Sequence, residues 1–301
     1  MSGGSARNKG LVVRGHGRHY IVEDEQGVRH TCHPRGKKSD CVVGDQVQWA
    51  ISGDAGVVEK VEPRRNLLFR QDEWKTKSFA ANLDQLLVLV AVEPVFSESQ
   101  LARALIAAES AGIPARIALN KTDLPGVASA RARLEPYRAM GVEVMEVALL
   151  TDQAGSRELL TPWLDGKSTF VLGPSGTGKS TLINLLIPDA KAQVGEISQA
   201  LNSGRHTTTT TQWYWLNRAA RTALIDSPGF QEFGLRQIDP QQLPLLMPDL
   251  RKHAGECRFY NCTHQHEPGC GVITAVESGE INASRFRIYG EILEELSSKR
   301  W

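Results

Sequence analysis

A glycine-rich segment near the middle of the chain has the residue types that bind phosphate. Residues 173–181 read GPSGTGKST and match the pattern G-x-x-x-x-G-K-[ST], with an apolar run before them and a helical stretch after them. Glycine lets the backbone wrap a phosphate, Lys179 would bridge the β- and γ-phosphates, and the Ser180 hydroxyl would bind Mg²⁺. A glycine-rich turn without a ligand is the alternative. The nucleotide-binding residues that this pattern predicts are Gly173, Pro174, Ser175, Gly176, Thr177, Gly178, Lys179, Ser180 and Thr181.

A carboxylate suited to the same Mg²⁺ follows further along the chain. Asp226-Ser-Pro-Gly229 comes after the apolar run 222–225 and resembles the D-x-x-G element of GTPases. In that element the aspartate holds Mg²⁺ through water and the glycine N–H meets the γ-phosphate. Asp226 could instead be an ordinary turn residue. Its position behind a P-loop favours a role in nucleotide and magnesium binding for Asp226 and Gly229.

A third motif selects the base. Asn120, Lys121, Thr122 and Asp123 close the apolar run 115–119 and resemble N-K-x-D. The Asp123 carboxylate would accept the N1–H and 2-amino hydrogens of guanine, and adenine offers neither donor in that arrangement, so the motif favours GTP over ATP. The stem of Lys121 would cover the base, and Asn120 would tie this loop to the P-loop. A lone tetrapeptide of this kind could also be a turn.

The order of the three motifs is unusual. Ordinary GTPases run P-loop, D-x-x-G, N-K-x-D, whereas here N-K-x-D comes first. The sequence therefore predicts a circularly permuted domain. The expected strand 142–147 then leads into the position of the base-supporting loop, where the amide of Ala148 is a candidate contact.

A cysteine-rich segment near the C-terminus has the ligands of a metal site. Three of the five cysteines, Cys257, Cys262 and Cys270, lie close together among histidines. Three thiolates and one imidazole form a closed structural Zn²⁺ site with no open position for chemistry. The candidate imidazoles are His253, His264 and His266, and free buried cysteines are the alternative. The other two cysteines, Cys32 and Cys41, lack a third partner nearby, and we expect them to be packing residues.

The elements that must position these residues fall into three parts. The chain has 301 residues and 41% hydrophobic residues, which is typical of a globular protein with two or three domains. Residues 10–61 contain five short strands broken by turn residues, which indicates a small closed barrel. From residue 86 onward apolar strands alternate with helical stretches, so we expect a parallel sheet with helices on both faces. The chain ends in a helical pattern over 281–296. We place the domain boundaries at 1–68, 69–238 and 239–301.

Composition excludes several classes of protein. With 35 Lys+Arg against 34 Asp+Glu, the net charge of +1 excludes a histone-like or acidic-tail polypeptide. The longest apolar run, 86–92, is far below the ~18 to 20 residues of a membrane-spanning helix. Residues 1–7 have no apolar core, so we expect no secretory signal and a cytoplasmic protein without a membrane partner.

The permuted motif order, a basic barrel before it and a Cys/His cluster after it resemble the RsgA (YjeQ) family of ribosome small subunit-dependent GTPases over nearly the whole chain. The resemblance implies an N-terminal OB-fold β-barrel, a central circularly permuted α/β P-loop GTPase domain and a C-terminal zinc-binding domain with helices. It selects His264 as the fourth ligand of one structural zinc ion per chain. It also implies Mg²⁺ with GTP, and the small (30S) ribosomal subunit with its 16S rRNA as partners in late subunit maturation. We expect a monomer.

The resemblance extends to a switch segment at Gly204–Thr209. In the family a switch threonine reaches Mg²⁺ and the γ-phosphate, and Thr207, Thr208 and Thr209 stay open for that role, with Thr208 as our candidate. Phe230 stands where Ras-like enzymes carry the glutamine that orients the attacking water. Because phenylalanine cannot do this, His206 is the nearest polar candidate, with an ordinary surface histidine as the alternative. The catalytic residues that we expect are His206, Lys179 and Thr208.

The barrel is the part expected to face RNA. Residues 1–70 hold 12 Lys/Arg against 8 Asp/Glu, and one loop region concentrates basic side chains. An OB-fold binds oligonucleotides on one face and its flanking loops. A solvated basic loop without a partner is the alternative, and we expect Tyr20 and Trp49 in the barrel core rather than stacked on bases. The basic residues of the loop region are Arg29, His30, His33, Arg35, Lys37 and Lys38.

Two other functions compete with a ribosome-dependent GTPase. A metabolic or signalling GTPase without an RNA partner would not need the basic barrel. A nucleic-acid-binding adaptor with a relic nucleotide site would not need Lys179, Ser180, Asp226 and Asp123 intact.

Overall fold

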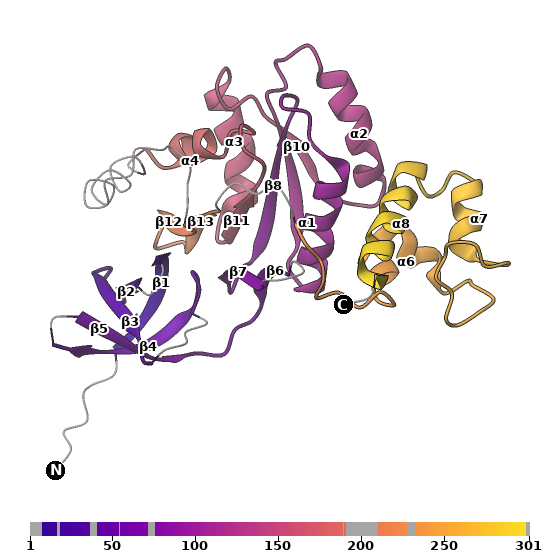
Figure 1. The fold of residues 1–301 in the computed structure, drawn as a ribbon. Helices are drawn as coiled ribbons and strands as arrows, with labels where there is room; N and C mark the ends of the chain where they lie inside the picture. The colour runs from indigo at the N-terminus through magenta and orange to yellow at the C-terminus, as the bar shows by residue number, and fades with distance from the viewer. Residues whose placement is uncertain are drawn as a thin grey trace.

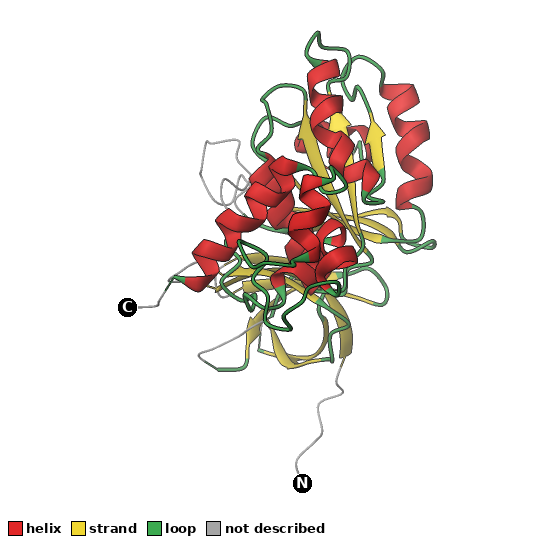
Figure 2. Ribbon diagram, turned by 90° about the vertical axis from the view of Figure 1, so that its right-hand side faces the viewer, coloured by secondary structure: helices red, strands yellow, loops and turns green. Residues whose placement is uncertain are grey.

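A computed structural model describes residues 8–16, 19–36, 41–53, 55–71, 76–188, 190, 210–227 and 233–298. Three parts follow one another along the chain. An N-terminal barrel and the C-terminal helices lie on different sides of a central sheet (Figure 1). Figure 2 views the molecule from the side of the C-terminal helices, which stand in front of the strands. No helix in the described ranges is long and apolar enough to cross a membrane.

Five strands close the N-terminal barrel. β1 pairs with both β2 and β4, and the strand order β1-β2-β3-β5-β4 returns to β1, with only β3 and β5 parallel. The predicted barrel is confirmed. Its interior holds Tyr20, Cys32, Cys41 and Trp49, all of them buried, as the sequence led us to expect. The strands are β1 (Asn8–His16), β2 (His19–Asp24), β3 (Arg29–Pro34), β4 (Gln46–Ser52) and β5 (Ala55–Val61).

The central sheet has the strand order β10-β9-β8-β11-β13-β12, and all of its neighbours are parallel except β12. The P-loop strand β11 lies in the middle of this sheet. β8, β9 and β10 follow on one side of it, and β13 and β12 follow on the other. Beyond β12 the sheet continues into the barrel through the pair Arg14–Gln212. The strands are β8 (Gln85–Ala91), β9 (Ala115–Asn120), β10 (Val144–Glu146), β11 (Ser168–Leu172), β12 (Gln212–Asn217) and β13 (Thr222–Asp226).

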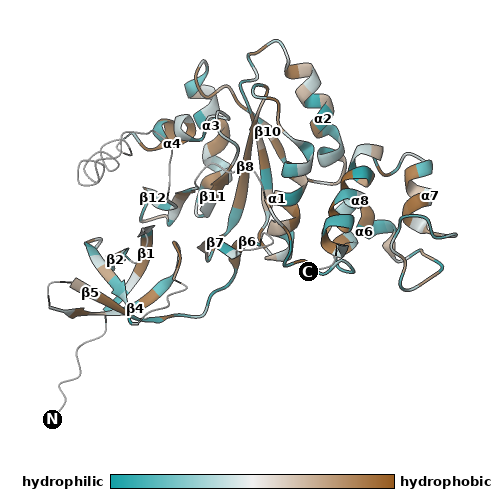
Figure 3. Ribbon diagram, viewed as in Figure 1, coloured by the Kyte–Doolittle hydropathy of each residue, from teal (hydrophilic) through white to brown (hydrophobic). Residues whose placement is uncertain are grey.

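Helices cover both faces of this sheet because its strands are apolar on both sides. In β8, Leu86 and Val88 belong to the hydrophobic cluster of α1 and α2, whereas Leu87 and Leu89 belong to that of α3 and α4. Hydrophobic residues accordingly run along the middle strands (Figure 3). The expected doubly covered parallel sheet is confirmed. The helices are α1 (Glu98–Ser110), α2 (Val127–Ala139), α3 (Gln153–Leu164) and α4 (Lys179–Leu186).

The C-terminal helices share a hydrophobic core with the sheet. Ile288 and Ile292, from the apolar spacing seen in the sequence, are fully buried in the same cluster as Leu101 of α1. Arg285 of α8 forms a buried ion pair with Asp249 of α6 at 2.8 Å. This part is therefore docked on α1 rather than free. Its elements are the 3-10 helix η1 (Leu243–Leu246), α6 (Pro248–Ala254), α7 (Gly271–Glu277) and α8 (Ala283–Ser297).

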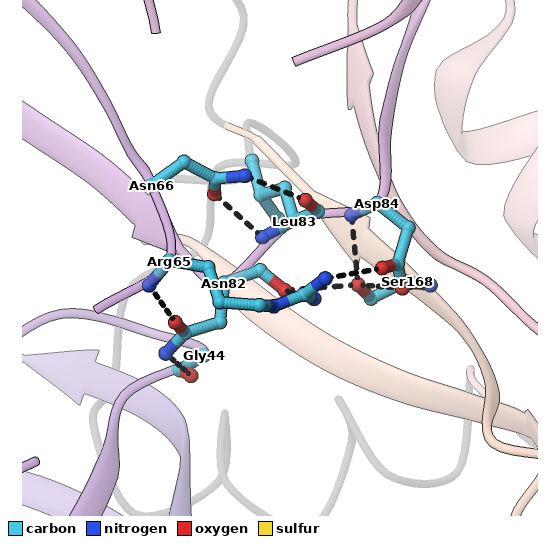
Figure 4. Close-up of polar contacts among 7 residues, drawn as sticks. All are labelled: Gly44, Arg65, Asn66, Asn82, Leu83, Asp84 and Ser168. Atoms are coloured by element: carbon cyan, nitrogen blue, oxygen red, sulfur yellow. Dashed lines mark hydrogen bonds and ion pairs between the residues drawn. The ribbon is translucent and has the colours of Figure 1, made fainter. Parts of the chain in front are cut away.

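A polar network joins the barrel to the central sheet at the two-stranded sheet of β6 (Leu67–Gln71) and β7 (Thr76–Ala81) (Figure 4). The Asn82 side chain donates to the carbonyl of Gly44 in the barrel at 2.9 Å. Arg65 donates to the Asn82 carbonyl at 2.8 Å and pairs with Asp84 at 2.9 Å. Asp84 in turn accepts the Ser168 amide at 2.8 Å, where β11 begins. The barrel is thus connected to the strand that carries the P-loop.

Gly44 offers a test of this junction. Its φ is +90°, and an added Cβ would fall against the carbonyl oxygen of Ala81, deep inside van der Waals contact. Gly53 has φ +65° but open space around its Cβ position. We expect Gly53→Ala to cost about 1 kcal/mol from backbone strain alone, and Gly44→Ala clearly more, because the backbone at Ala81 must also move. Urea denaturation of both variants measures the difference, and equal losses would contradict the close packing at Gly44.

Candidate functional site

The P-loop follows β11 directly and its glycines are required by the backbone. Gly176 and Gly178 have φ of +81° and +105°, which L residues with side chains rarely adopt. A Cβ at Gly173 would press against the carbonyl oxygen of Leu89, and one at Gly178 against the amide of Asn120. Glycine is therefore required at these positions of the loop. The loop leads into the N-terminus of α4, whose free N–H groups favour an anion.

Lys179 is folded back over this loop. Its Nζ donates to the carbonyl of Gly173 at 2.6 Å and to that of Pro174 at 3.0 Å, and Thr177 Oγ1 also donates to Pro174 at 2.9 Å. Burial lowers the pKa of Lys179, and the nearby Asp226 carboxylate opposes that shift. An ammonium group that is held by neutral carbonyls alone is well placed to exchange them for phosphate oxygens.

Asp226 lies at the end of β13, beside the P-loop strand. It is buried and in register with Val171 of β11, and the next residue, Ser227, donates its hydroxyl to the Val171 carbonyl at 2.7 Å. The strand end therefore brings the first residue of D-x-x-G next to Lys179. Gly229, Phe230, His206 and the switch threonines 207–209 lie outside the described residues.

Asn120 joins three loops of the site. Its buried amide donates to the Thr177 carbonyl in the P-loop at 2.9 Å, and its side-chain oxygen accepts the Leu149 N–H at 3.1 Å. The tie that we expected between base loop and P-loop is present. The N–H of Ala148, however, donates to Ser156 Oγ at 3.2 Å, so this amide is engaged within the protein. Sequence reasoning did not single out Leu149 or Ser156, since apolar and serine residues at a loop carry no motif.

The remaining N-K-x-D residues are presented at the surface. Lys121 has φ +63°, a conformation uncommon for a residue with a side chain and often found at functional sites. Thr122 Oγ1 donates to the Val147 carbonyl at 3.1 Å, which holds the loop against the end of β10. The Asp123 side chain is exposed and accepts no hydrogen bond from any residue that the structure describes. Its carboxylate is thus available to a ligand.

The basic loop region of the barrel is partly neutralised by nearby carboxylates. Arg29 pairs with Glu23 at 3.1 Å, His30 lies 2.8 Å from Asp24, and Arg35 pairs with Glu59 at 3.5 Å. The His33 ring packs against His19. Lys37 and Lys38 lie outside the described residues. The positive potential of this region is therefore weaker than its basic residues alone indicate.

The Cys/His cluster comes together as the sequence predicts. The ligand atoms of Cys257, Cys262, His264 and Cys270 all lie within 4.8 Å of one another. His264 Nδ1 is 3.4 Å from both the Cys257 and Cys270 sulfurs, which are 3.8 Å apart. Zn–S bonds of about 2.3 Å and Zn–N bonds of about 2.0 Å in a tetrahedron require separations of about 3.8 Å and 3.5 Å. The cluster thus has the dimensions of a four-coordinate metal site.

The surroundings of the cluster favour a cation. Burial raises the pKa of Cys262 to about 12 and that of Cys270 above its usual value, so thiolates form here only if a positive charge compensates them. Burial also lowers the pKa of His264, which keeps the imidazole neutral and able to bind metal. The rival His253 instead faces Glu256 at 3.2 Å. His266 is exposed and does not join the cluster.

Comparison with known proteins gives concordant matches. A family model described as RsgA GTPase matches residues 61–236. A protein of Variovorax paradoxus (strain S110) named Small ribosomal subunit biogenesis GTPase RsgA is 59% identical over all of this chain and 96% of its own length. A protein of the same name from Paraburkholderia xenovorans (strain LB400) is 52% identical over 97% of this chain and 95% of its own.

Solved structures agree with the sequence matches. YjeQ from Thermotoga maritima superposes with a TM-score of 0.74 at 30% identity, covering 98% of this chain and all of its own. YloQ, described as a circularly permuted GTPase, superposes with a TM-score of 0.71 at 26% identity, over 100% and 99% of the two chains. The circular permutation that the motif order predicted is confirmed.

The base-reading role of Asp123 can be tested by substitution. Asp123→Asn should weaken GTP binding and relax the preference for guanine, because the amide replaces one acceptor oxygen by a donor facing the base. Competition binding with guanine and xanthine nucleotides measures this, with Asp239→Asn as an exposed control. Unchanged guanine selectivity would show that Asp123 does not read the base.

The metal site can be tested by chelation and by Cys262→Ser. Either change should first unfold the loop around 257–270, because metal binding supplies folding free energy that a short loop cannot obtain from a core. Metal analysis should find about one zinc ion per chain in the unaltered protein. Cys32→Ala, which removes a buried thiol of the barrel, should keep the full zinc content. A metal-free protein with unchanged resistance to proteolysis would contradict the site.

Proposed function

This chain belongs to the RsgA GTPase family, and we propose that it hydrolyses GTP on the small (30S) ribosomal subunit during late maturation of that subunit. The observation that carries the proposal is the contact of Asn120 with the P-loop, which brings the base-reading loop to the phosphate loop in spite of the permuted order. The relatives at 59% and 52% identity carry the name small ribosomal subunit biogenesis GTPase. They match the barrel as well as the GTPase part.

The nucleotide site has a proposed role for each motif. Asp123 reads guanine, Lys179 and the P-loop N–H groups bind the β- and γ-phosphates, and Ser180 with Asp226 holds Mg²⁺. The metal ion supplies charge neutralisation on the phosphates when it is bound. The geometry that supports this is the register of Asp226 with the P-loop strand and the position of Lys179 over the loop.

The Cys/His cluster is proposed to hold one structural zinc ion. Three sulfurs and one imidazole nitrogen favour Zn²⁺ over Mg²⁺ or Ca²⁺, which prefer oxygen ligands. All four ligands come from the protein, so no position is open for a substrate. The ion would stabilise the loop between α6 and α7, and the Tyr289 hydroxyl, which donates to the Thr263 carbonyl at 2.7 Å, would anchor that loop on α8.

The remaining parts serve partner binding in this proposal. The barrel is the 16S rRNA-binding part, and its exposed basic residues would contact phosphates. We also propose that the protein is a cytoplasmic monomer with domains 1–68, 69–238 and 239–301, of which the third is docked on α1.

The proposal predicts slow GTP hydrolysis by the free protein and faster hydrolysis on small subunits. Phe230 cannot orient water, so the partner must complete the site. Single-turnover hydrolysis with and without purified small subunits measures this, and absent stimulation would favour a GTPase without an RNA partner.

His206→Ala should cut the stimulated rate by ~10² or more with near-normal nucleotide affinity, the signature of a contact made in the transition state. Lys179→Ala should lower both the stimulated rate of hydrolysis and the affinity for nucleotide. A His206→Ala rate equal to wild type would eliminate that histidine.

A further inference from the structure

A half-buried guanidinium at the seam between barrel and central sheet is not used by any of the GTPase motifs. It belongs to Arg14 of β1. Its Nη1 is buried and meets no hydrogen-bond acceptor among the residues that the structure describes. Burial also lowers the pKa of Arg14. A charged donor that is buried without an acceptor is costly, so a protein that retains one places it where an anion or a functional charge lies near.

The position of Arg14 in the sheet points to that anion. Arg14 lies opposite Gln212 of β12, and Gln212 lies opposite Asp226 of β13. Strand neighbours are about 4.8 Å apart, so the Cα atoms of Arg14 and Asp226 are separated by roughly 10 Å. Opposed residues of antiparallel strands project to the same face of the sheet. Arg14, Gln212 and Asp226 thus form one row across three neighbouring strands. The barrel contributes the cation at one end of this row, and Asp226, the carboxylate proposed to bind Mg²⁺, is at the other end.

That face is the one that carries the P-loop helix. Tyr214 and Leu224, which alternate in step with Gln212 and Asp226, pack in the same hydrophobic cluster as Leu182 of α4. Burial raises the pKa of Tyr214 to about 12, the Asp226 carboxylate acts in the same direction, and the Arg14 charge opposes both. The three side chains therefore lie within electrostatic reach of one another.

A second contact holds the barrel in this position. The buried carboxylate of Glu23 in β2 accepts the indole N–H of Trp215 at 2.7 Å and pairs with Arg218 at 2.8 Å. Trp215 belongs to β12 and Arg218 to the turn after it, so β2 is bound to the hairpin that contains Asp226. Because β1 pairs with both β2 and β12, these contacts hold the backbone at Arg14 against the hairpin, and a positioned charge can act on a reaction with little reorganisation.

We propose that Arg14 is a positioning residue for GTP hydrolysis, a cation that the barrel holds in register with Asp226. The inference rests on the proposed function of the nucleotide site. A fixed positive charge on the phosphate side of the sheet stabilises the negative charge that the carboxylate and phosphates bring together. Because this charge is carried by the RNA-binding part, a partner that shifts the barrel against β12 also shifts the charge.

The test compares two substitutions that keep the aliphatic stem of the side chain. Arg14→Met removes the charge and Arg14→Lys retains it. We expect Arg14→Met to lower single-turnover GTP hydrolysis on saturating small subunits about tenfold, and Arg14→Lys to recover most of that loss. Binding of a non-hydrolysable GTP analogue and co-sedimentation with the subunits should stay at wild-type values in both variants, and the melting temperature should not fall below that of the wild type. Arg287→Met, which removes an exposed cation of α8 outside the barrel, is the matched control for the loss of one positive charge.

Several results would overturn the inference. A wild-type rate in Arg14→Met excludes any role of the charge. Equal losses of rate and melting temperature in Arg14→Met and Arg14→Lys indicate packing instead. Loss of co-sedimentation in Arg14→Met alone makes Arg14 an rRNA contact. Subunit-free hydrolysis of all variants is measured in parallel, because missing stimulation in the wild type counts against the proposed function, whereas an unchanged Arg14→Met rate counts against this inference.

Discussion

The buried carboxamide of Asn120 is the contact on which the nucleotide site depends. One side chain at the end of β9 donates to the P-loop carbonyl of Thr177 and accepts the N–H of Leu149. Both partners are backbone groups of other loops, so losing this amide would leave a buried carbonyl and a buried N–H unpaired. The close approach also explains Gly178, where any Cβ would displace the amide. Base loop, phosphate loop and supporting loop are thereby held as one unit.

The permuted chain can build this unit because a parallel sheet collects its strand ends at one edge. Asn120, the P-loop and Asp226 follow β9, β11 and β13, and the carboxyl ends of parallel strands lie together whatever their order along the chain. The permutation changes what is attached to the domain instead. It leaves the barrel paired with the edge strand β12 and the C-terminal helices packed on α1.

Those attachments differ in the place where they meet the domain. The barrel meets the sheet through one strand pair, the buried Glu23, the polar network around Asn82 and Asp84, and an apolar contact. In that contact Leu11, Val13 and Val43 pack in the same hydrophobic cluster as the central sheet. The C-terminal helices share the hydrophobic cluster of α1, and the Ser284 hydroxyl of α8 donates to the Glu98 carboxylate of α1 at 3.1 Å. Glu98 also pairs with Arg133 of α2 at 2.8 Å. The barrel joins the sheet at β12, the neighbour of the strand that ends at Asp226, whereas the C-terminal helices pack on the side of α1. The barrel is therefore the better placed of the two to act on the nucleotide site.

The sequence by itself determined which residues form the nucleotide and Cys/His motifs and which segments form strands and helices. Local residue types were enough to locate the P-loop glycines, Asn120, the cysteines of the Cys/His cluster, the barrel strands and the two-faced sheet, because each depends on neighbours within a few residues. The residue pattern left open which histidine joins the cysteines, and the family resemblance selected His264, which the structure bears out. Only the tertiary structure brought His264 Nδ1 to 3.4 Å from two sulfurs and turned His253 to Glu256.

The partners of the charged side chains and the register of the strand pairs were also decided only by the tertiary structure. Nothing local in the sequence indicates that Glu23, Asp24 and Glu59 neutralise the basic loop region, or that Arg14 lies in one row with Asp226. Strand pairing joins Arg14 to Gln212, about 200 positions further along the chain, and the register of such a pair is set by the packing of whole faces rather than by any short pattern. Which side chains meet across such pairs is therefore decided only when the chain folds.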